Sequence, residues 1–242
     1  MRIPSIGNVM KNSTTDIVYI YKQDLNDSEE LKFSIRSVVQ NWDYRKIWII
    51  GDCPQWLDKN KIGVLGYNRH FGNKYQDVNN KLLEACDCLD ISDNFWFFND
   101  DFFIMKKINS EKYKVYSDGT LENKLLSVTI KNPTDKAYIE GFEDLLEEFP
   151  NGISYETHTP MLFNKKQLKE LLIKYPQSPC RRSLYGNYYG VEAETRKDCK
   201  IYKLTEKVNQ KEPILSTTNI AFFGNSGKII KSMFKEKTIY EY

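Results

Sequence analysis

The chain has 242 residues, 40% of them hydrophobic and 28% charged, which is the composition of an ordinary soluble globular protein. Its net charge of +2, from 35 basic and 33 acidic side chains, argues against a strong polyanion binder. Five cysteines without a CxxC pair and two histidines disfavour a disulfide framework or a structural zinc site. The sequence has no signal-peptide pattern and no apolar run long enough to span a membrane, so we expect a cytoplasmic protein.

The N-terminal part alternates between strand and helix patterns. Apolar residues at helical spacing predict one helix after a cap at Asp27 or Ser28 and another over residues 78–88. Apolar, β-rich runs predict buried strands at residues 16–21, 47–50, 62–65 and 95–98. This alternation predicts an α/β fold, with a mostly parallel sheet between layers of helices. Ligands of such sheets bind beyond the carboxyl ends of the strands, which directs attention to residues 99–101.

The remainder of the chain has a less regular pattern. Residues 106–152 are rich in charge and predict an insertion or second lobe, with a helix near residues 139–149. Residues 164–175 have a clear amphipathic pattern, and residues 227–234 predict a short helix. Lysines gather near the C-terminus, where we expect a solvated helix face.

The most informative segment is FWFFNDDFFIM, residues 95–105. Here Asp100 and Asp101 lie between apolar runs, and a buried carboxylate costs several kcal/mol to desolvate unless a cation compensates it. Carboxylate oxygens suit Mg²⁺ or Mn²⁺ shared with substrate phosphates, so the segment predicts a metal and diphosphate site. The alternative is a tight turn between two hairpin strands, because Asn and Asp are common in turns.

Other polar residues are weaker candidates. His158 lies on a predicted loop, where an imidazole can serve as a general base or as a metal ligand. Arg181 and Arg182 together can neutralise a diphosphate, although taken alone they fit a surface pair, and Asp198 fits an ordinary surface residue. The sequence lacks GxSxG, GxGxxG after the first strand and a P-loop, which disfavours α/β-hydrolases, dinucleotide oxidoreductases and P-loop enzymes.

The chain resembles the Stealth-type sugar-phosphotransferases in the order of five segments: DIVYIY, EELKFSIRSV, KIWIIGDCPQWL, NFWFFNDDFFIM and HTPMLFNKKQL. These enzymes make capsular polysaccharide or modify glycans, and their core is similar to the GT-A glycosyltransferase fold. RRSLYGN and the C-terminal pattern LSTTN…F…G…I…F…YE resemble compact, often phage-encoded, relatives. The resemblance implies one GT-A-like catalytic domain over residues 1–242. Within it, residues 16–105 would bind the nucleotide-sugar and residues 106–242 would form an insertion and the acceptor side.

The resemblance also implies roles for individual residues. Asn99, Asp100 and Asp101 match the metal and diphosphate motif. His158 matches the histidine of an HxP motif near the reaction centre, and Asp198 matches an acidic position that binds metal or acts as a base. Donor-binding positions are then expected at Tyr19, Lys74, Asn80, Arg182, Tyr185 and Asn187.

The segment after the first strand departs from the family pattern. Stealth enzymes usually carry a DGSDP-like segment there. In this chain, Gln23 and Asn26 stand where that motif has two carboxylates. If phosphoryl transfer requires one of these carboxylates, the chain performs glycosyl transfer instead. We therefore expect a UDP-sugar donor with Mn²⁺ or Mg²⁺ and a glycan or other hydroxyl acceptor, ahead of sugar-1-phosphate transfer. Glycosylation of modified phage DNA is a second hypothesis, and a binding module without catalysis is the third. The sequence leaves the oligomeric state open.

Overall fold

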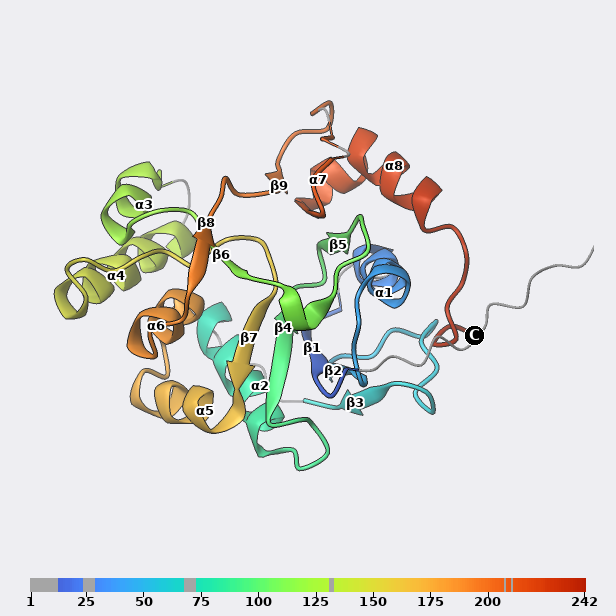
Figure 1. Ribbon diagram of the computed structural model, residues 1–242, viewed down its shortest axis with the longest axis horizontal. Helices are drawn as coiled ribbons and strands as arrows, with labels where there is room; N and C mark the ends of the chain where they lie inside the picture. Colours follow the sequence, from blue (N-terminus) through green and yellow to red (C-terminus); the bar gives the residue numbers. More distant parts are fainter. Residues whose placement is uncertain (1–12, 24–28, 68–72, 131–132, 207, 210) are drawn as a thin grey trace, which may run out of the picture.

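The structure is a computed structural model that describes residues 13–23, 29–67, 73–130, 133–206, 208–209 and 211–242. Its centre is a five-stranded sheet in the order β3-β2-β1-β4-β7 (Figure 1). The strands are β1 (Asp16–Tyr21), β2 (Ile47–Gly51), β3 (Gly63–Leu65), β4 (Asn94–Phe98) and β7 (Met161–Asn164). The first four run parallel, whereas β7 pairs antiparallel with β4. The carboxyl ends of four strands therefore meet at one edge of the sheet.

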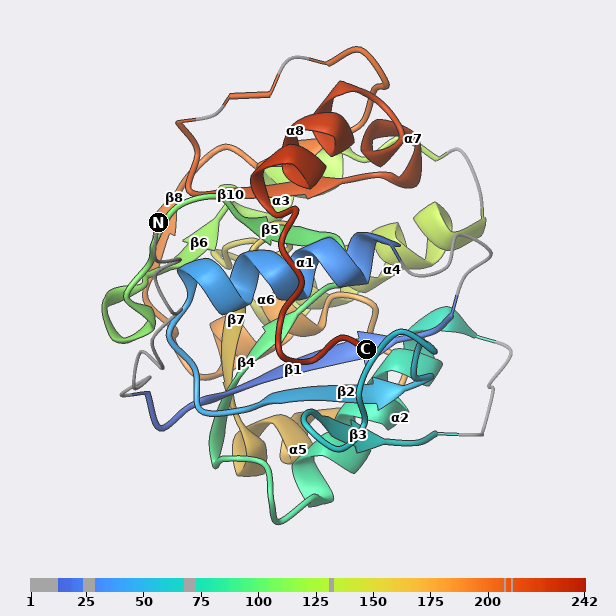
Figure 2. The same ribbon diagram turned by 90° about the vertical axis from the view of Figure 1, so that its right-hand side faces the viewer.

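Helices cover both faces of this main sheet (Figures 1 and 2). Helix α1 (Glu29–Asn41) lies on one face, and α2 (Lys74–Asp87) and α5 (Lys165–Lys174) lie on the other. Beside them stand α3 (Leu121–Ser127), α4 (Pro133–Glu148), α6 (Arg181–Tyr188) and a short 3-10 helix, η1 (Ser110–Lys112). No helix within the described residues is long and apolar enough to cross a bilayer.

A second, three-stranded sheet lies at one end of the main sheet. It consists of β5 (Phe102–Ile104), β10 (Ile214–Thr217) and β9 (Lys200–Ile201), with β10 in the middle. Figure 1 shows α7 (Asn219–Phe222) and α8 (Asn225–Met233) beside this sheet. A separate pair joins β6 (Val115–Ser117) to β8 (Ala193–Thr195).

Two features define the ends of β1. At the start, Asp16 is fully buried and accepts hydrogen bonds from the Arg45 guanidinium at 2.7 and 2.5 Å and from Trp48 Nε1 at 3.0 Å. At the carboxyl end of the neighbouring β2, Gly51 has a φ of 122°, and a Cβ there would fall 2.1 Å from the carbonyl oxygen of Tyr21. Glycine therefore allows the chain to leave β2 directly beside the end of β1.

The sequence correctly predicted the fold class, the four parallel strands and the helices α1, α2, α4, α5 and α8. The proposed helix caps at Asp27 and Ser28, and the replaced carboxylate position Asn26, lie outside the described residues. Residues 106–152 contain α3 as well as the expected α4. The hairpin alternative is wrong, because β4 and β5 belong to different sheets.

Candidate functional site

The NDD segment connects the two sheets. Strand β4 ends at Phe98, and the chain turns through residues 99–101 into β5, with a hydrogen bond of 3.3 Å from Phe102 N to Asn99 O. β4 pairs in parallel register with β1, so that Phe98 lies beside Tyr19 near the carboxyl ends of both strands. The segment thus occupies the edge at which ligands of parallel sheets bind.

Asp101 is held by the small sheet. Its Oδ2 accepts a hydrogen bond of 3.0 Å from Ser216 Oγ and forms an ion pair with the Lys200 ammonium. Lys200 and Ser216 are register partners on β9 and β10, and Ser216 is also the partner of Phe102 on β5. The three side chains therefore form a row across the small sheet, which we call the Asp101–Lys200–Ser216 row. The side chains of Asp101 and Lys200 are only 13% and 14% exposed.

One oxygen of this carboxylate lacks a partner. Asp101 Oδ1 is buried and receives no hydrogen bond within the described residues. Those residues contain no group of three or more His, Cys, Asp or Glu side chains that could enclose a metal. Mg²⁺ and Mn²⁺ are commonly held by one or two carboxylates together with substrate phosphates, and an unpaired buried oxygen fits such an ion. The residues present are therefore compatible with a metal shared with a diphosphate, with Asp101 and its neighbour Asp100 as protein ligands.

Arg182 approaches the NDD segment from α6. Its Nη2 donates a hydrogen bond of 2.9 Å to Asn99 Oδ1, and its guanidinium stacks 4.7 Å from the ring centre of Phe97. Arg182 is 6% exposed, so the expectation of a surface pair is wrong for this residue. Burial lowers the pKa of Arg182, and the negative charge of Glu156 opposes that shift. Because Asn99 Oδ1 already accepts a hydrogen bond from Arg182, the role of Asn99 in this structure is to hold the Arg182 guanidinium beside the NDD segment.

Glu156 fixes the start of α6. Its Oε1 accepts hydrogen bonds from the backbone N–H groups of Arg182 at 3.0 Å and Ser183 at 3.1 Å, where the helix dipole favours a negative charge. The adjacent Arg181, also buried, donates from Nε to Asn79 Oδ1 at 2.7 Å. Arg182 Nε is buried and has no partner within the described residues, which leaves one donor for an anion.

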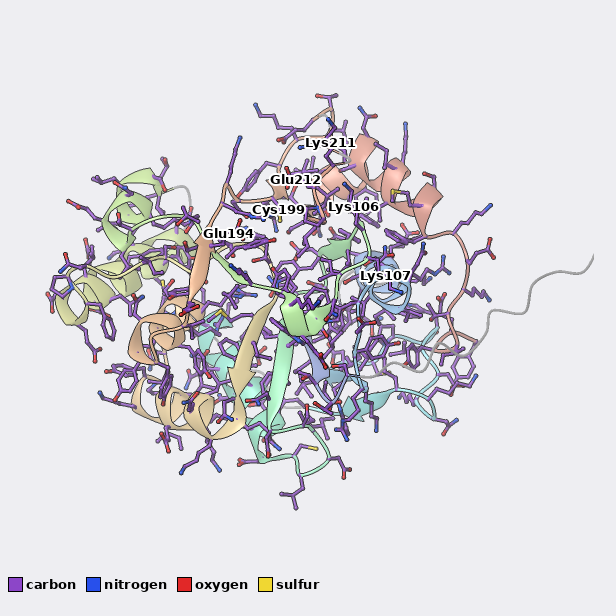
Figure 3. All side chains as sticks on the ribbon, viewed as in Figure 1. Lys106, Lys107, Glu194, Cys199, Lys211 and Glu212 are labelled. Atoms are coloured by element: carbon purple, nitrogen blue, oxygen red, sulfur yellow. The ribbon has the colours of Figure 1, made fainter. Side chains whose placement is uncertain are left out.

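His158 and Asp198 form a hydrogen-bonded pair. Asp198 Oδ2 lies 2.7 Å from His158 Nδ1, and its Oδ1 accepts the His158 backbone N–H at 3.1 Å. Burial alone would raise the pKa of Asp198, but the hydrogen bonds and charge of His158 outweigh this effect and lower the pKa to about 2. Asp198 is therefore ionised at neutral pH, places the proton on Nδ1, and leaves Nε2 as the basic nitrogen. Cys199, labelled between β8 and β9 in Figure 3, donates its thiol hydrogen to the His158 carbonyl oxygen.

Glu30 on α1 belongs to the same neighbourhood. It accepts a hydrogen bond of 2.8 Å from Thr217 Oγ1, next to Ser216 on β10. Burial raises its pKa to about 7; the Thr217 hydrogen bond opposes the shift, and the charges of Asp101 and Asp100 add to it. A carboxyl group with this pKa carries a proton for part of the time at neutral pH.

Sequence reasoning missed four residues at this site: Glu30, Glu156, Lys200 and Ser216. Their residue types alone give no signal of a role, and the fold brings them to the NDD segment, because β5, β10 and β9 pair with one another and α1 and α6 lie beside them. The charged run that contains Lys200, RKDCK, drew attention only to Asp198.

The structure does not bring Tyr185 and Asn187 to the NDD segment. Tyr185 OH accepts the Asn164 backbone N–H at 3.0 Å, and Asn164 is the register partner of Asn94 at the start of β4. At about 3.3 Å per residue, this position lies more than 10 Å from the carboxyl end of that strand. Asn187 bonds the backbone of Ile153 through both of its side-chain polar atoms.

The remaining predicted donor-binding residues occupy three different positions. Tyr19 is fully buried, and its OH lies 3.0 Å from Ser34 Oγ, which donates to Phe102 O. Through Ser34, Tyr19 therefore supports the backbone directly after the NDD segment. Lys74 is exposed at the first turn of α2, and because α2 returns from β3 to the start of β4, it lies on the carboxyl-end side of the sheet. Asn80 Nδ2 is buried without a partner within the described residues.

A cavity of about 1090 Å³ lies elsewhere, along β4 and β7. Its lining includes Asn94, Trp96 and Asn164, so it extends toward the amino end of β4. None of Asp101, His158 and Asp198 lines it. We therefore assign the candidate site from the arrangement of polar side chains and not from this cavity.

Comparisons with known proteins find similarity to sugar-transferring enzymes. No protein-family model matches the chain. Capsular polysaccharide phosphotransferase SacB of Neisseria meningitidis serogroup A is 27% identical over 199 residues, and the match covers 71% of this chain and 36% of SacB. SacB of strain DSM 15465 / Z2491 gives the same values, so the chain spans little more than a third of the length of these relatives.

Solved structures provide the fold. The galactosyltransferase LgtC, determined in complex with donor and acceptor sugar analogues, matches with a TM-score of 0.53 at 8% sequence identity. The match covers 93% of this chain and 96% of LgtC. Both chains share a mixed sheet, dominated by parallel strands and flanked by helices. The chain therefore has the GT-A glycosyltransferase fold.

Proposed function

We propose that the chain is a metal-dependent glycosyltransferase, which moves a sugar from a nucleotide-sugar, most simply a UDP-sugar, to a hydroxyl group of a glycan. The observation that carries the proposal is the position of Asp101, a buried carboxylate with one unpaired oxygen at the carboxyl end of β4, beside the buried Arg182. The GT-A fold and the similarity to SacB support it.

The proposed reaction divides the work between two groups of residues. A bound Mg²⁺ or Mn²⁺ would supply Lewis-acid neutralisation of the leaving diphosphate. Asp101, with Asp100, would hold that ion, and Arg182 would orient the diphosphate through its unpaired Nε–H. His158 Nε2 would take the proton from the acceptor hydroxyl as it attacks the sugar carbon, while Asp198 stabilises the protonated ring. The bond from that carbon to the diphosphate oxygen breaks, and the nucleoside diphosphate leaves.

Asp101→Asn tests the role of this carboxylate. We expect the wild type to bind and turn over at least one member of a panel of UDP-, GDP- and CMP-sugars in Mn²⁺, measured by calorimetry and by release of nucleotide. The variant keeps the shape of the side chain but should lose turnover by at least about a hundredfold. Asp87→Asn is the matched control, because Asp87 pairs with Lys169 at the end of α2 away from the site. A wild type that binds none of these donors, or a fully active Asp101→Asn, would contradict the proposal.

Sugar-1-phosphate transfer is the second candidate, favoured by the similarity to SacB, a capsular polysaccharide phosphotransferase. Glycosyl transfer is favoured because Gln23 and Asn26 stand where the related motif has carboxylates. The backbone N–H of Gln23 donates to Asp52 Oδ2 at 2.7 Å, and Asn26 lies outside the described residues. A donor labelled in its β-phosphate separates the two reactions. Glycosyl transfer leaves the label in the released nucleoside diphosphate, whereas sugar-phosphate transfer moves the label to the acceptor and releases the nucleoside monophosphate.

The acceptor and the cellular setting complete the proposal. The near-neutral charge favours a glycan over duplex DNA, and a DNA gel shift at two salt concentrations tests the modified bases of phage DNA as the other acceptor. All five cysteines are free thiols, which supports a reducing compartment such as the cytoplasm.

A further inference from the structure

The Asp101–Lys200–Ser216 row already contains a cation. The ammonium of Lys200 lies against Asp101 Oδ2, and Ser216 Oγ occupies the same oxygen at 3.0 Å. The side chains of Asp101 and Lys200 are only 13% and 14% exposed, so solvent screens this ion pair weakly. Their position is fixed by strand pairing, since Lys200 and Ser216 are register partners on β9 and β10.

We propose that Lys200 is a built-in counter-cation, which competes with a divalent metal for Asp101 and so sets the metal affinity of the site. This inference rests on the proposed function only in taking Asp101 as a metal ligand. The pairing with Lys200 leaves Asp101 one unpaired oxygen, Oδ1, and cancels most of its charge. A dication at Oδ1 would therefore bind a nearly neutral carboxylate and face a positive charge a few ångströms away.

The competition has a consequence for substrate binding. A nucleoside diphosphate brings negative charge that both the ammonium and the metal can share. In the wild type, metal should therefore bind weakly alone and much more tightly together with the nucleotide, and by linkage each ligand strengthens the other. Without the ammonium, Asp101 alone should attract the metal, and the dependence on nucleotide should decrease. Arg182, which contacts Asn99 and not Asp101, supplies positive charge in both cases.

Lys200→Met tests the inference through direct metal binding. We expect Mn²⁺ alone, measured by the electron paramagnetic resonance of the free ion, to bind this variant at least about tenfold more tightly than the wild type, equal to about 1.4 kcal/mol. UDP should then raise the Mn²⁺ affinity of the variant by a smaller factor than that of the wild type. Lys200→Arg keeps the charge and should retain weak binding. Lys169→Met, which removes the lysine of the remote pair with Asp87, should leave Mn²⁺ affinity unchanged.

Several results would overturn the inference. Equal or weaker Mn²⁺ binding by a folded Lys200→Met, with circular dichroism melting as the check of folding, contradicts the competition. Lys200→Gln is the second neutral variant, and it should also bind more tightly than the wild type. If neither neutral variant folds, Lys200 is a structural residue and the inference is wrong. Failure of the proposed function is separate: a wild type without transferase activity leaves the comparison of Mn²⁺ affinities intact, whereas equal affinities in an active enzyme remove this inference alone.

Discussion

Asp198 holds His158 at two points, at the ring through Nδ1 and at the backbone through its amide. A ring fixed in this way cannot rotate without losing a bond to an ionised carboxylate, and its basic Nε2 therefore keeps one direction. Asp198 comes from a segment 40 residues farther along the chain. The pair resembles a general base with its orienting carboxylate, which is how the proposed reaction uses it.

Replacement of His158 should therefore reduce catalysis more than binding. We expect His158→Ala to lower kcat by about 10² to 10⁴, the usual contribution of a general base, with little change in KM for the donor. Asp198→Asn should lower kcat by a similar factor, because a neutral amide cannot stabilise the protonated ring and can donate to Nδ1, which moves the ring proton to Nε2. Steady-state kinetics of nucleotide release, with a melting curve for each variant, checks both. A His158→Ala enzyme with wild-type kcat would remove the histidine from the mechanism.

Glu30 should make stability depend on pH. Its pKa is raised from 4.5 to about 7 in the folded protein, so the carboxyl group favours the folded state below pH 4.5, and this advantage is lost as the pH rises through 7. Glu30→Gln, which stays neutral, should match the wild type near pH 4.5 and unfold with a free energy higher by about 1 to 3 kcal/mol at pH 8.

Urea unfolding at several pH values measures this difference. Glu29→Gln is the matched control in the same turn of α1, because Glu29 pairs with Lys231 at 2.6 Å on the surface. It should show no comparable gain at pH 8. Curves for Glu30→Gln and the wild type that stay parallel from pH 4.5 to 8 would contradict a raised pKa at Glu30.

Asn187 should matter for stability and not for donor binding. Its side chain accepts from Ile153 N at 2.9 Å and donates to the carbonyl oxygens of Ile153 and Ser183 at 2.8 Å. Asn187→Ala leaves these groups without partners and should lower the free energy of unfolding by about 1 to 3 kcal/mol. The KM for the donor, measured below the melting temperature, should stay within about twofold. A large rise in KM without loss of stability would support the sequence-based hypothesis that Asn187 binds substrate.

Local patterns predicted most of the fold, because strands such as β1 and β4 are continuous apolar runs and α5 has a clear amphipathic period. The NDD segment stood out for the same reason, as acids at the end of an apolar strand. Lys200 and Glu30 could not be found in this way, since their partners Asp101 and Thr217 are distant in sequence. Tyr185 and Asn187 were expected at the donor from the resemblance of their segment RRSLYGN to related enzymes, but their hydrogen bonds hold the backbone of other segments.

The row across the small sheet also determines when the site can exist during synthesis. The ribosome makes Asp101 and its strand early, but the ammonium and the hydroxyl that hold this carboxylate arrive 99 and 115 residues later. Until β9 and β10 have emerged and paired with β5, a growing chain carries the acidic segment without its organising partners. Strands β1 to β4 of the main sheet all precede β9 and β10 in the chain, so the row can be completed only after Thr217, at the end of β10, has been synthesised.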